Sequence, residues 1–145
     1  LYLHGSFGSG KSYMIAALFN ELVKDGREAI IVYFPEMLRT LKASFNTDFD
    51  SRMDELKTCE LLLLDDIGAE AVTAWSRDEI LGTILQYRMD QGLTTFFTSN
   101  LNIEELETHL SETKNNIDIL KARRIIERIK QLTEDMELIS KNRRV

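Results

Sequence analysis

The sequence predicts an α/β fold in which a parallel sheet carries helices on both faces. Two observations lead to this fold class. Short apolar runs rich in Leu, Ile, Val and Phe alternate with longer segments whose apolar residues recur every three to four positions. In addition, a glycine-rich loop at residues 5–12 follows the first apolar run and precedes the first helical segment. Strands that alternate with helices pair in parallel, because each crossover helix returns the chain to the same end of the sheet.

In the first half of the chain, β-branched and aromatic runs predict strands, and amphipathic segments predict helices. Gly26 lies where a helix C-cap belongs, and Pro35, the only proline, ends one strand and can open the next helix. We expect strands at 2–4, 29–34 and 60–66, and helices at 11–24, 35–45 and 51–57.

In the second half, Gly92 follows an amphipathic segment and predicts its end. The polar stretch 111–116 is expected to be mobile. We expect helices at 77–91, 104–110 and 119–132, and strands at 94–98 and 136–139. The five strands together predict a three-layer sandwich around a five-stranded parallel sheet.

The composition indicates one ordinary domain. The chain has 145 residues, of which 43% are hydrophobic, and Cys59 is the only cysteine, so no internal disulfide can form. No apolar run approaches the length of a membrane span, and we expect a cytoplasmic protein without a membrane partner. The chain starts inside a predicted strand without an initiating Met, so we expect it to be a fragment.

The charges are distributed unevenly. The net charge is −6; residues 46–79 hold three basic and ten acidic residues, and residues 114–145 hold nine basic and five acidic ones. This pattern is typical of a head-to-tail partner or a local anion site, and two solvated faces are the simpler alternative.

The loop at residues 5–12 fits the phosphate-binding pattern G-x-x-x-x-G-K-[ST]. Glycines let main-chain N–H groups approach an anion, and the positive end of the following helix points at the same place. Lys11 can reach the β- and γ-phosphates, and the Ser12 hydroxyl can ligate Mg²⁺. A plain glycine-rich turn is the alternative. The expected ATP- or ADP-binding residues are Gly5, Ser6, Phe7, Gly8, Ser9, Gly10, Lys11 and Ser12.

Polar residues also follow two later strands. Four leucines lead into Asp65 and Asp66, which is the Walker B arrangement: Asp65 would hold Mg²⁺ and Asp66 would orient the attacking water. Asn100 follows the fourth strand and would lie beside the γ-phosphate. A strand-end or helix cap is the alternative for Asp66, and an Asx turn for Asn100.

The basic helix at 119–132 places Arg124 and Arg128 on one face. An arginine presented to a neighbouring subunit's γ-phosphate can act as a finger, and solvated surface is the alternative.

The sequence resembles the AAA+ domain of bacterial primosomal helicase loaders of the DnaC/DnaI type. The resemblance is strongest to the DnaI-like branch of Gram-positive bacteria. The stretches that carry it are "GSFGSGKS", "LLLLDDIGAE", "WSRDEIL", "TTFFTSNL", "KARRIIERI" and "NRR". The resemblance implies a single AAA+ ATPase domain over residues 1–145, without a helical lid and without the family's N-terminal helicase-binding domain. It implies that Asn100 is sensor 1, that Arg128 is the finger with Arg124 as competitor, and that Arg143 or Arg144 is sensor 2.

The resemblance also implies a function and partners. The family loads a hexameric replicative helicase onto single-stranded DNA, and Arg39, Lys42 and Phe45 would supply DNA contacts. For Phe45, core packing is the alternative and the preferred interpretation. The second Walker B carboxylate is Asp66 instead of Glu, which suggests slow hydrolysis. Three alternatives stay open: an IstB-type transposition helper ATPase, a P-loop kinase for a small molecule, and a nucleotide-dependent binding module that does not hydrolyse.

Overall fold

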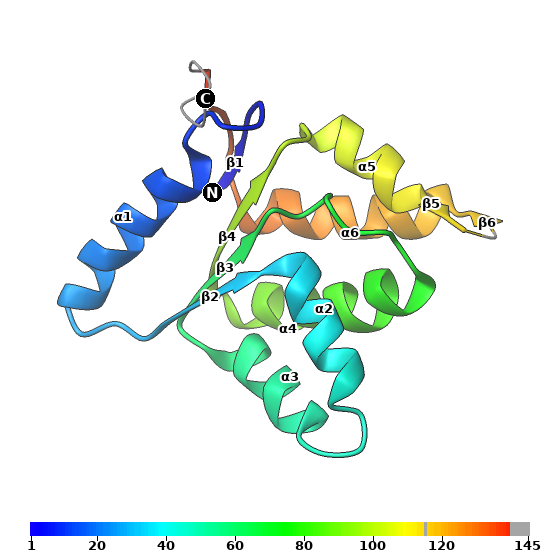
Figure 1. Cartoon of the computed structure of the whole chain (residues 1–145), viewed down its shortest axis with the longest axis horizontal. Helices are drawn as coiled ribbons and strands as arrows, with labels where there is room; N and C mark the ends of the chain where they lie inside the picture. Colours follow the sequence, from blue (N-terminus) through cyan, green and yellow to red (C-terminus); the bar gives the residue numbers. More distant parts are fainter. Residues whose placement is uncertain (115, 140–145) are drawn as a thin grey trace.

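Five parallel strands form one sheet between two layers of helices in the computed structural model, which describes residues 1–114 and 116–139 (Figure 1). Their order across the sheet is β2-β3-β4-β1-β7, so the strand that comes first in the sequence lies between β4 and β7. The predicted five-stranded parallel sheet is confirmed. The strands are β1 (Tyr2–His4), β2 (Ala29–Tyr33), β3 (Leu61–Asp65), β4 (Thr94–Ser99) and β7 (Asp135–Glu137).

Helices cover both faces of this sheet (Figure 1). Side chains along a strand alternate between faces, so Leu61 and Leu63 of β3 pack against the first helix, whereas Leu62 and Leu64 face the larger core on the other side. The helices are α1 (Lys11–Lys24), α2 (Phe34–Ala43), α3 (Phe49–Thr58), the π-helix η1 (Trp75–Leu81), α4 (Gly82–Gln91), α5 (Ile103–Ser111) and α6 (Ile119–Leu132).

The carboxyl ends of the strands meet at one edge of the sheet, where ligands bind in folds of this type. The register pairs His4 with Ser99 and Tyr33 with Asp65. The segments that follow β1, β3 and β4 therefore lie next to one another, and these are the segments for which the sequence predicts phosphate, metal and water contacts.

One pair of strands was not predicted. In the stretch 111–116, which was expected to be mobile, Glu112–Thr113 (β5) pairs with Asn116–Ile117 (β6) as a short antiparallel ladder. The Asp118 N–H donates to the Ser111 carbonyl and closes the hairpin at its base. Polar composition alone does not reveal such main-chain pairing.

Several predicted boundaries also move. Phe34 was expected in a strand and opens α2, and the final strand is Asp135–Glu137 instead of residues 136–139. The helix expected to begin at Arg77 begins two residues earlier and starts as a π-helix. Thr73 and Ser76 hydrogen bond reciprocally at its start, which fixes the entry of the chain. None of the helices in residues 1–114 and 116–139 has the length and apolarity that crossing a bilayer requires.

Candidate functional site

The loop between β1 and α1 has the backbone geometry of an anion cradle. Gly8 and Gly10 adopt positive φ values of 78° and 98°, which side chains with a Cβ rarely tolerate. Gly10 is also the N-cap of α1, and the first turn of α1 contains no acidic side chain. The positive end of the helix is therefore not neutralised from within its own first turn, which suits a phosphate group.

Lys11 joins this loop to the end of β4. Its side chain is buried, and its Nζ donates to the carbonyl oxygens of Gly5 and Ser6 at 2.9 and 3.0 Å. The same Nζ donates to Asn100 Oδ1 at 2.8 Å. The structure thus brings together two residues 89 positions apart that the sequence assigned to one phosphate site.

Asp65, at the end of β3, accepts hydrogen bonds from two hydroxyl groups. Ser12 Oγ donates to Asp65 Oδ1 at 3.0 Å, and Thr98 Oγ1 donates to the same oxygen. A hydroxyl and a carboxylate in contact are the two protein groups that hold Mg²⁺ in a P-loop site, where phosphate oxygens and water complete the shell. Such a site needs no third acidic ligand, and no cluster of three His, Cys, Asp or Glu suited to a metal occurs among the described residues. The donor set fits Mg²⁺.

Asp66 has an unusual backbone conformation. Its φ is +61°, the one positive value of a non-glycine residue in the described chain. Its N–H donates to Thr98 Oγ1 at 2.8 Å, and its Oδ2 accepts from the Tyr33 hydroxyl at 3.2 Å. The Asp66 charge raises the pKa of the Tyr33 phenol, which favours the protonated hydroxyl that donates to Asp66. Left-handed residues of this kind gather at functional sites.

Two of these contacts were missed at the sequence level. Thr98 donates to Asp65 and accepts from the Asp66 N–H, so one hydroxyl aligns both carboxylate residues. Tyr33 pairs in register with Asp65 across the two strands. The position of Tyr33 at the carboxyl end of a strand could have indicated a place in the site. Aromatic residues are common within strands, however, so the sequence alone did not distinguish this role from strand packing.

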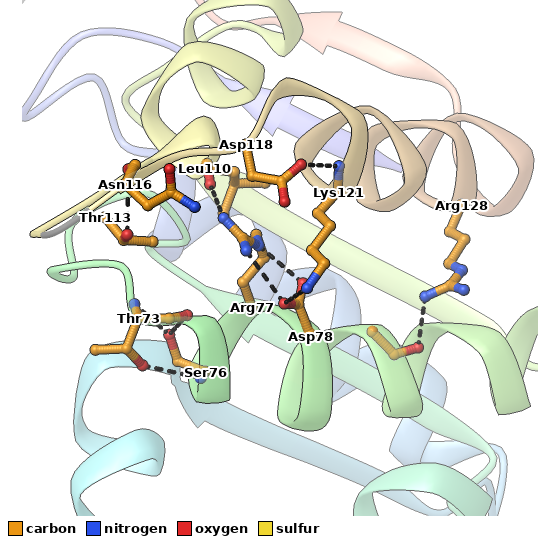
Figure 2. A network of polar contacts seen from close by, with 11 residues as sticks. Thr73, Ser76, Arg77, Asp78, Leu110, Thr113, Asn116, Asp118, Lys121 and Arg128 are labelled. Carbon is orange, nitrogen blue, oxygen red and sulfur yellow. Dashed lines mark hydrogen bonds and ion pairs between the residues drawn. The ribbon is translucent and has the colours of Figure 1, made fainter.

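The predicted arginines lie outside this group or outside the described residues. In α6, Arg128 Nη1 donates to the Gly82 carbonyl at 3.1 Å, where η1 meets α4 (Figure 2). Arg124 is exposed on the same helix. Arg143 and Arg144 lie outside the described residues.

The predicted DNA-contacting residues share a surface of α2. Arg39 and Lys42 are exposed and line a groove between α2 and residues 69–76, together with Trp75. Phe45 is 51% exposed, and its ring lies 5.0 Å from Phe49 and 5.4 Å from Trp75 between centroids. Phe45 is therefore the exposed member of an aromatic cluster, not a core residue.

The parallel sheet, the glycine loop and the paired carboxylates define a P-loop domain of the AAA+ type. The sequence model of the IstB-like ATP binding protein family matches residues 1–139, and the chain belongs to that family. It is 44% identical to the replicative helicase loader DnaI of Bacillus subtilis strain 168 over 99% of this chain, and it spans 47% of that protein's length.

Solved structures agree with this assignment. A crystal structure of DnaI superposes with a TM-score of 0.85 at 46% identity, covering 99% of this chain and 71% of that chain. The DnaC helicase loader superposes with a TM-score of 0.74 at 22% identity, covering 96% of this chain and 77% of that chain. The second likeness shows the shared fold.

Proposed function

We propose that this domain binds ATP with Mg²⁺ at the 5–12 loop and hydrolyses it. The observation that carries the proposal is the meeting of Ser12, Asp65, Lys11 and Asn100 at one edge of the sheet. Lys11 would bind the β- and γ-phosphates, Ser12 and Asp65 would hold the ion, and Asn100 would hold the attacking water from the side of β4. When bound, Mg²⁺ neutralises the charge that develops on the phosphates.

Asp66 is the residue that we propose to orient the attacking water. Its carboxylate lies at the same edge as Asp65, one residue further along the chain. An Asp side chain is one methylene shorter than Glu, so its reach toward the water is smaller, and we infer slow hydrolysis.

We further propose that the chain is the ATPase part of a helicase loader. DnaI and DnaC are named as replicative helicase loaders, and this chain covers less than half of each protein. The partner would be the hexameric replicative DNA helicase, contacted mainly by a separate N-terminal domain, and the site of action would be the cytoplasm. The 44% identity to DnaI supports this proposal.

Single-stranded DNA is the proposed second partner. Arg39 and Lys42 present positive charge along the groove, and Phe45 offers an exposed ring beside Trp75. Cations that follow a phosphate backbone and aromatic rings on which bases stack are the usual components of a single-strand site.

Self-association from head to tail is the third proposal. Arg128 contacts the η1–α4 junction of its own chain instead of its own 5–12 loop, so its use in hydrolysis requires a neighbour. A contact between two different surfaces produces a ring or a spiral.

Substitution of the two carboxylates tests the ATPase. Asp66→Asn should keep ATP binding and lose hydrolysis by about 10²-fold or more. Asp65→Asn should also weaken Mg²⁺-dependent binding, and Asp25→Asn at the exposed end of α1 is the control. Equal turnover by wild type and Asp66→Asn would remove the water-orienting role.

A transposition helper is the second candidate function, because the matching family model is IstB-like. Co-sedimentation of the full-length protein separates the two. A helicase loader should sediment with a replicative helicase in the presence of ATP. Sedimentation with a transposase instead of the helicase would favour the helper.

A further inference from the structure

Asp66 opens a tight turn that needs external support. The Ala69 N–H donates to the Asp66 carbonyl at 3.4 Å, and Gly68 adopts a φ of +97°. Residues 66–70 are called the Asp66 turn below. An L-residue such as Asp66 prefers negative φ, so contacts around the turn must hold it in the left-handed conformation.

The first half of the Asp66 turn is held by β4. The Ile67 N–H donates to the Thr98 carbonyl at 3.0 Å, and Ser99 Oγ donates to the Ile67 carbonyl. Ile67 itself is fully buried. These contacts hold residues 66 and 67, but none of them reaches Gly68, whose φ of +97° needs another support.

The second half is held by Glu70. Its Oε2 accepts the Gly68 N–H at 2.8 Å, and its side chain is buried, with only 8% of the residue exposed. Burial raises the pKa of this carboxyl, because a buried position disfavours the charged form. The buried Glu70 side chain thus hydrogen bonds to a main-chain N–H of its own turn and stabilises the turn that begins at Asp66.

Helix α5 supports Glu70 from outside. His109 Nε2 lies 2.8 Å from the Glu70 carbonyl oxygen, at hydrogen-bonding distance. At the next residue, the Leu110 carbonyl accepts a hydrogen bond from Arg77 Nη1 at 3.0 Å (Figure 2). The last turn of α5 therefore holds the segment after Asp66 at two points, and α5 itself begins at Ile103, three residues after Asn100.

We propose that Glu70 and His109 are positioning residues for Asp66. They lock the Asp66 turn against α5, so that the Asp66 carboxylate stays at the nucleotide edge of the sheet. The proposal rests on the water-orienting role of Asp66 proposed above. Neither residue is placed in contact with nucleotide, so their loss should change the rate of hydrolysis and leave nucleotide affinity intact.

Three variants test this proposal, assayed without DNA at concentrations where wild type turns over. Glu70→Ala removes the acceptor for Gly68 and should lower kcat about tenfold or more, with ATP Kd within about twofold of wild type. Glu70→Gln keeps an acceptor oxygen and should retain most of the turnover. Glu79→Ala, at an exposed carboxylate in the following π-helix, is the matched control and should behave as wild type.

A double-mutant cycle separates positioning from general destabilisation. If Glu70 acts through Asp66, adding Glu70→Ala to Asp66→Asn should lower turnover little further. An equal fold-loss in both backgrounds, or a Glu70→Gln variant as slow as Glu70→Ala, would overturn the proposal. If Glu70→Ala does not fold, His109→Ala serves in the same cycle with the same expectations.

The cycle also distinguishes failure of the proposed role of Asp66 from failure of the positioning role of Glu70. A slow Asp66→Asn variant with a fully active Glu70→Ala variant would refute the positioning role alone. A fully active Asp66→Asn variant would refute the proposed role of Asp66 and the positioning role with it.

Discussion

The ammonium group of Lys11 donates hydrogen bonds both to a carbonyl of its own loop and to the side-chain amide of Asn100. Lys11 therefore links the 5–12 loop to the end of β4. Lys11→Ala should abolish ATP binding while the fold stays intact, because the backbone of α1 does not need the side chain. Isothermal titration with ATP and ADP measures the loss. Lys24→Ala changes an exposed lysine at the other end of the same helix and is the control. Unchanged affinity in Lys11→Ala would place the nucleotide elsewhere.

Glu70 gives the stability of the domain a pH dependence. Because burial raises its pKa in the folded state, the folded protein binds this proton at a higher pH than the unfolded chain does. Wild type therefore gains stability as the pH falls through the raised pKa, and the gain is complete below the ordinary Glu pKa. Glu70→Gln, which is always neutral, should be more stable than wild type at pH 7 and lose that advantage at acidic pH.

Urea unfolding followed by the fluorescence of Trp75, the only tryptophan, checks this expectation at several pH values. Glu79→Gln removes an exposed carboxylate nearby and should show no such pH-dependent gain. A stability difference between wild type and Glu70→Gln that stays constant with pH would contradict the assignment.

At the scale of elements, β7 and the segment after it lie against the start of the phosphate loop. The Leu138 N–H donates to the His4 carbonyl at 2.7 Å, and a Cβ added to Gly5 would lie 2.4 Å from the Leu138 carbonyl oxygen. Glycine at position 5 is therefore required by the close passage of another backbone.

Gly5→Ala should push this segment away from β1 and destabilise the domain by about 1–3 kcal/mol, as overpacking does elsewhere. Hydrogen exchange at the Leu138 amide should accelerate by about tenfold or more. Ser6→Ala, at the exposed neighbouring position, should change neither. Slow exchange at Leu138 in Gly5→Ala would show that the loop moves instead.

The sequence predicts the elements well where a period or a stop signal is strong. The strand of four leucines, the helix after the glycine loop and the basic helix at 119–132 all appear with bounds within one residue of the prediction. The hairpin at β5 and β6 and the π-helix η1 could not be predicted, because main-chain pairing and a change of helical register leave no period in the sequence.

Arg88 shows a further limit of sequence reasoning. It lies within a predicted amphipathic helix and has no exposed surface in the structure, where it donates to the carbonyls of Cys59 and Thr94 at 2.7 Å. It thereby joins α3, β3 and β4 at the edge opposite the site. An arginine in a helix normally reads as solvated surface, so tertiary contacts alone reveal this role.

For the candidate site, the sequence pattern predicted side chains that the structure brings to one edge of the sheet, but not the side chains that hold them there. Ser12, Asp65 and Asn100 follow from spacing, since strand ends in a parallel sheet share one edge. Thr98, Tyr33 and Glu70 act through hydrogen bonds whose partners lie far away in the sequence or in a turn without periodicity.

At the scale of the whole molecule, we expect hydrolysis to require two chains. Lys11→Ala and Arg128→Ala should each be inactive, and mixing them should restore part of the activity, because some interfaces then pair an intact loop with an intact arginine. An arginine finger contributes roughly 10³–10⁵ in rate, so the return is measurable by phosphate release. Mixing each variant with itself is the control. If mixing restores nothing where wild type turns over, Arg128 acts within its own chain or is surface.

The position of β1 also has a consequence for how the protein is made. Tyr2 pairs in register with Phe97 on one side and with Asp135 on the other, so the strand that carries the phosphate loop is synthesised long before either neighbour. At ordinary ribosomal speeds of about 5–20 residues per second, β1 waits on the order of ten seconds for the last strand. A chain cut short before residue 135 lacks that partner and the Leu138 N–H that donates to His4, next to the first glycine of the loop. We therefore expect ATP to bind a nascent chain only after β7 has been synthesised.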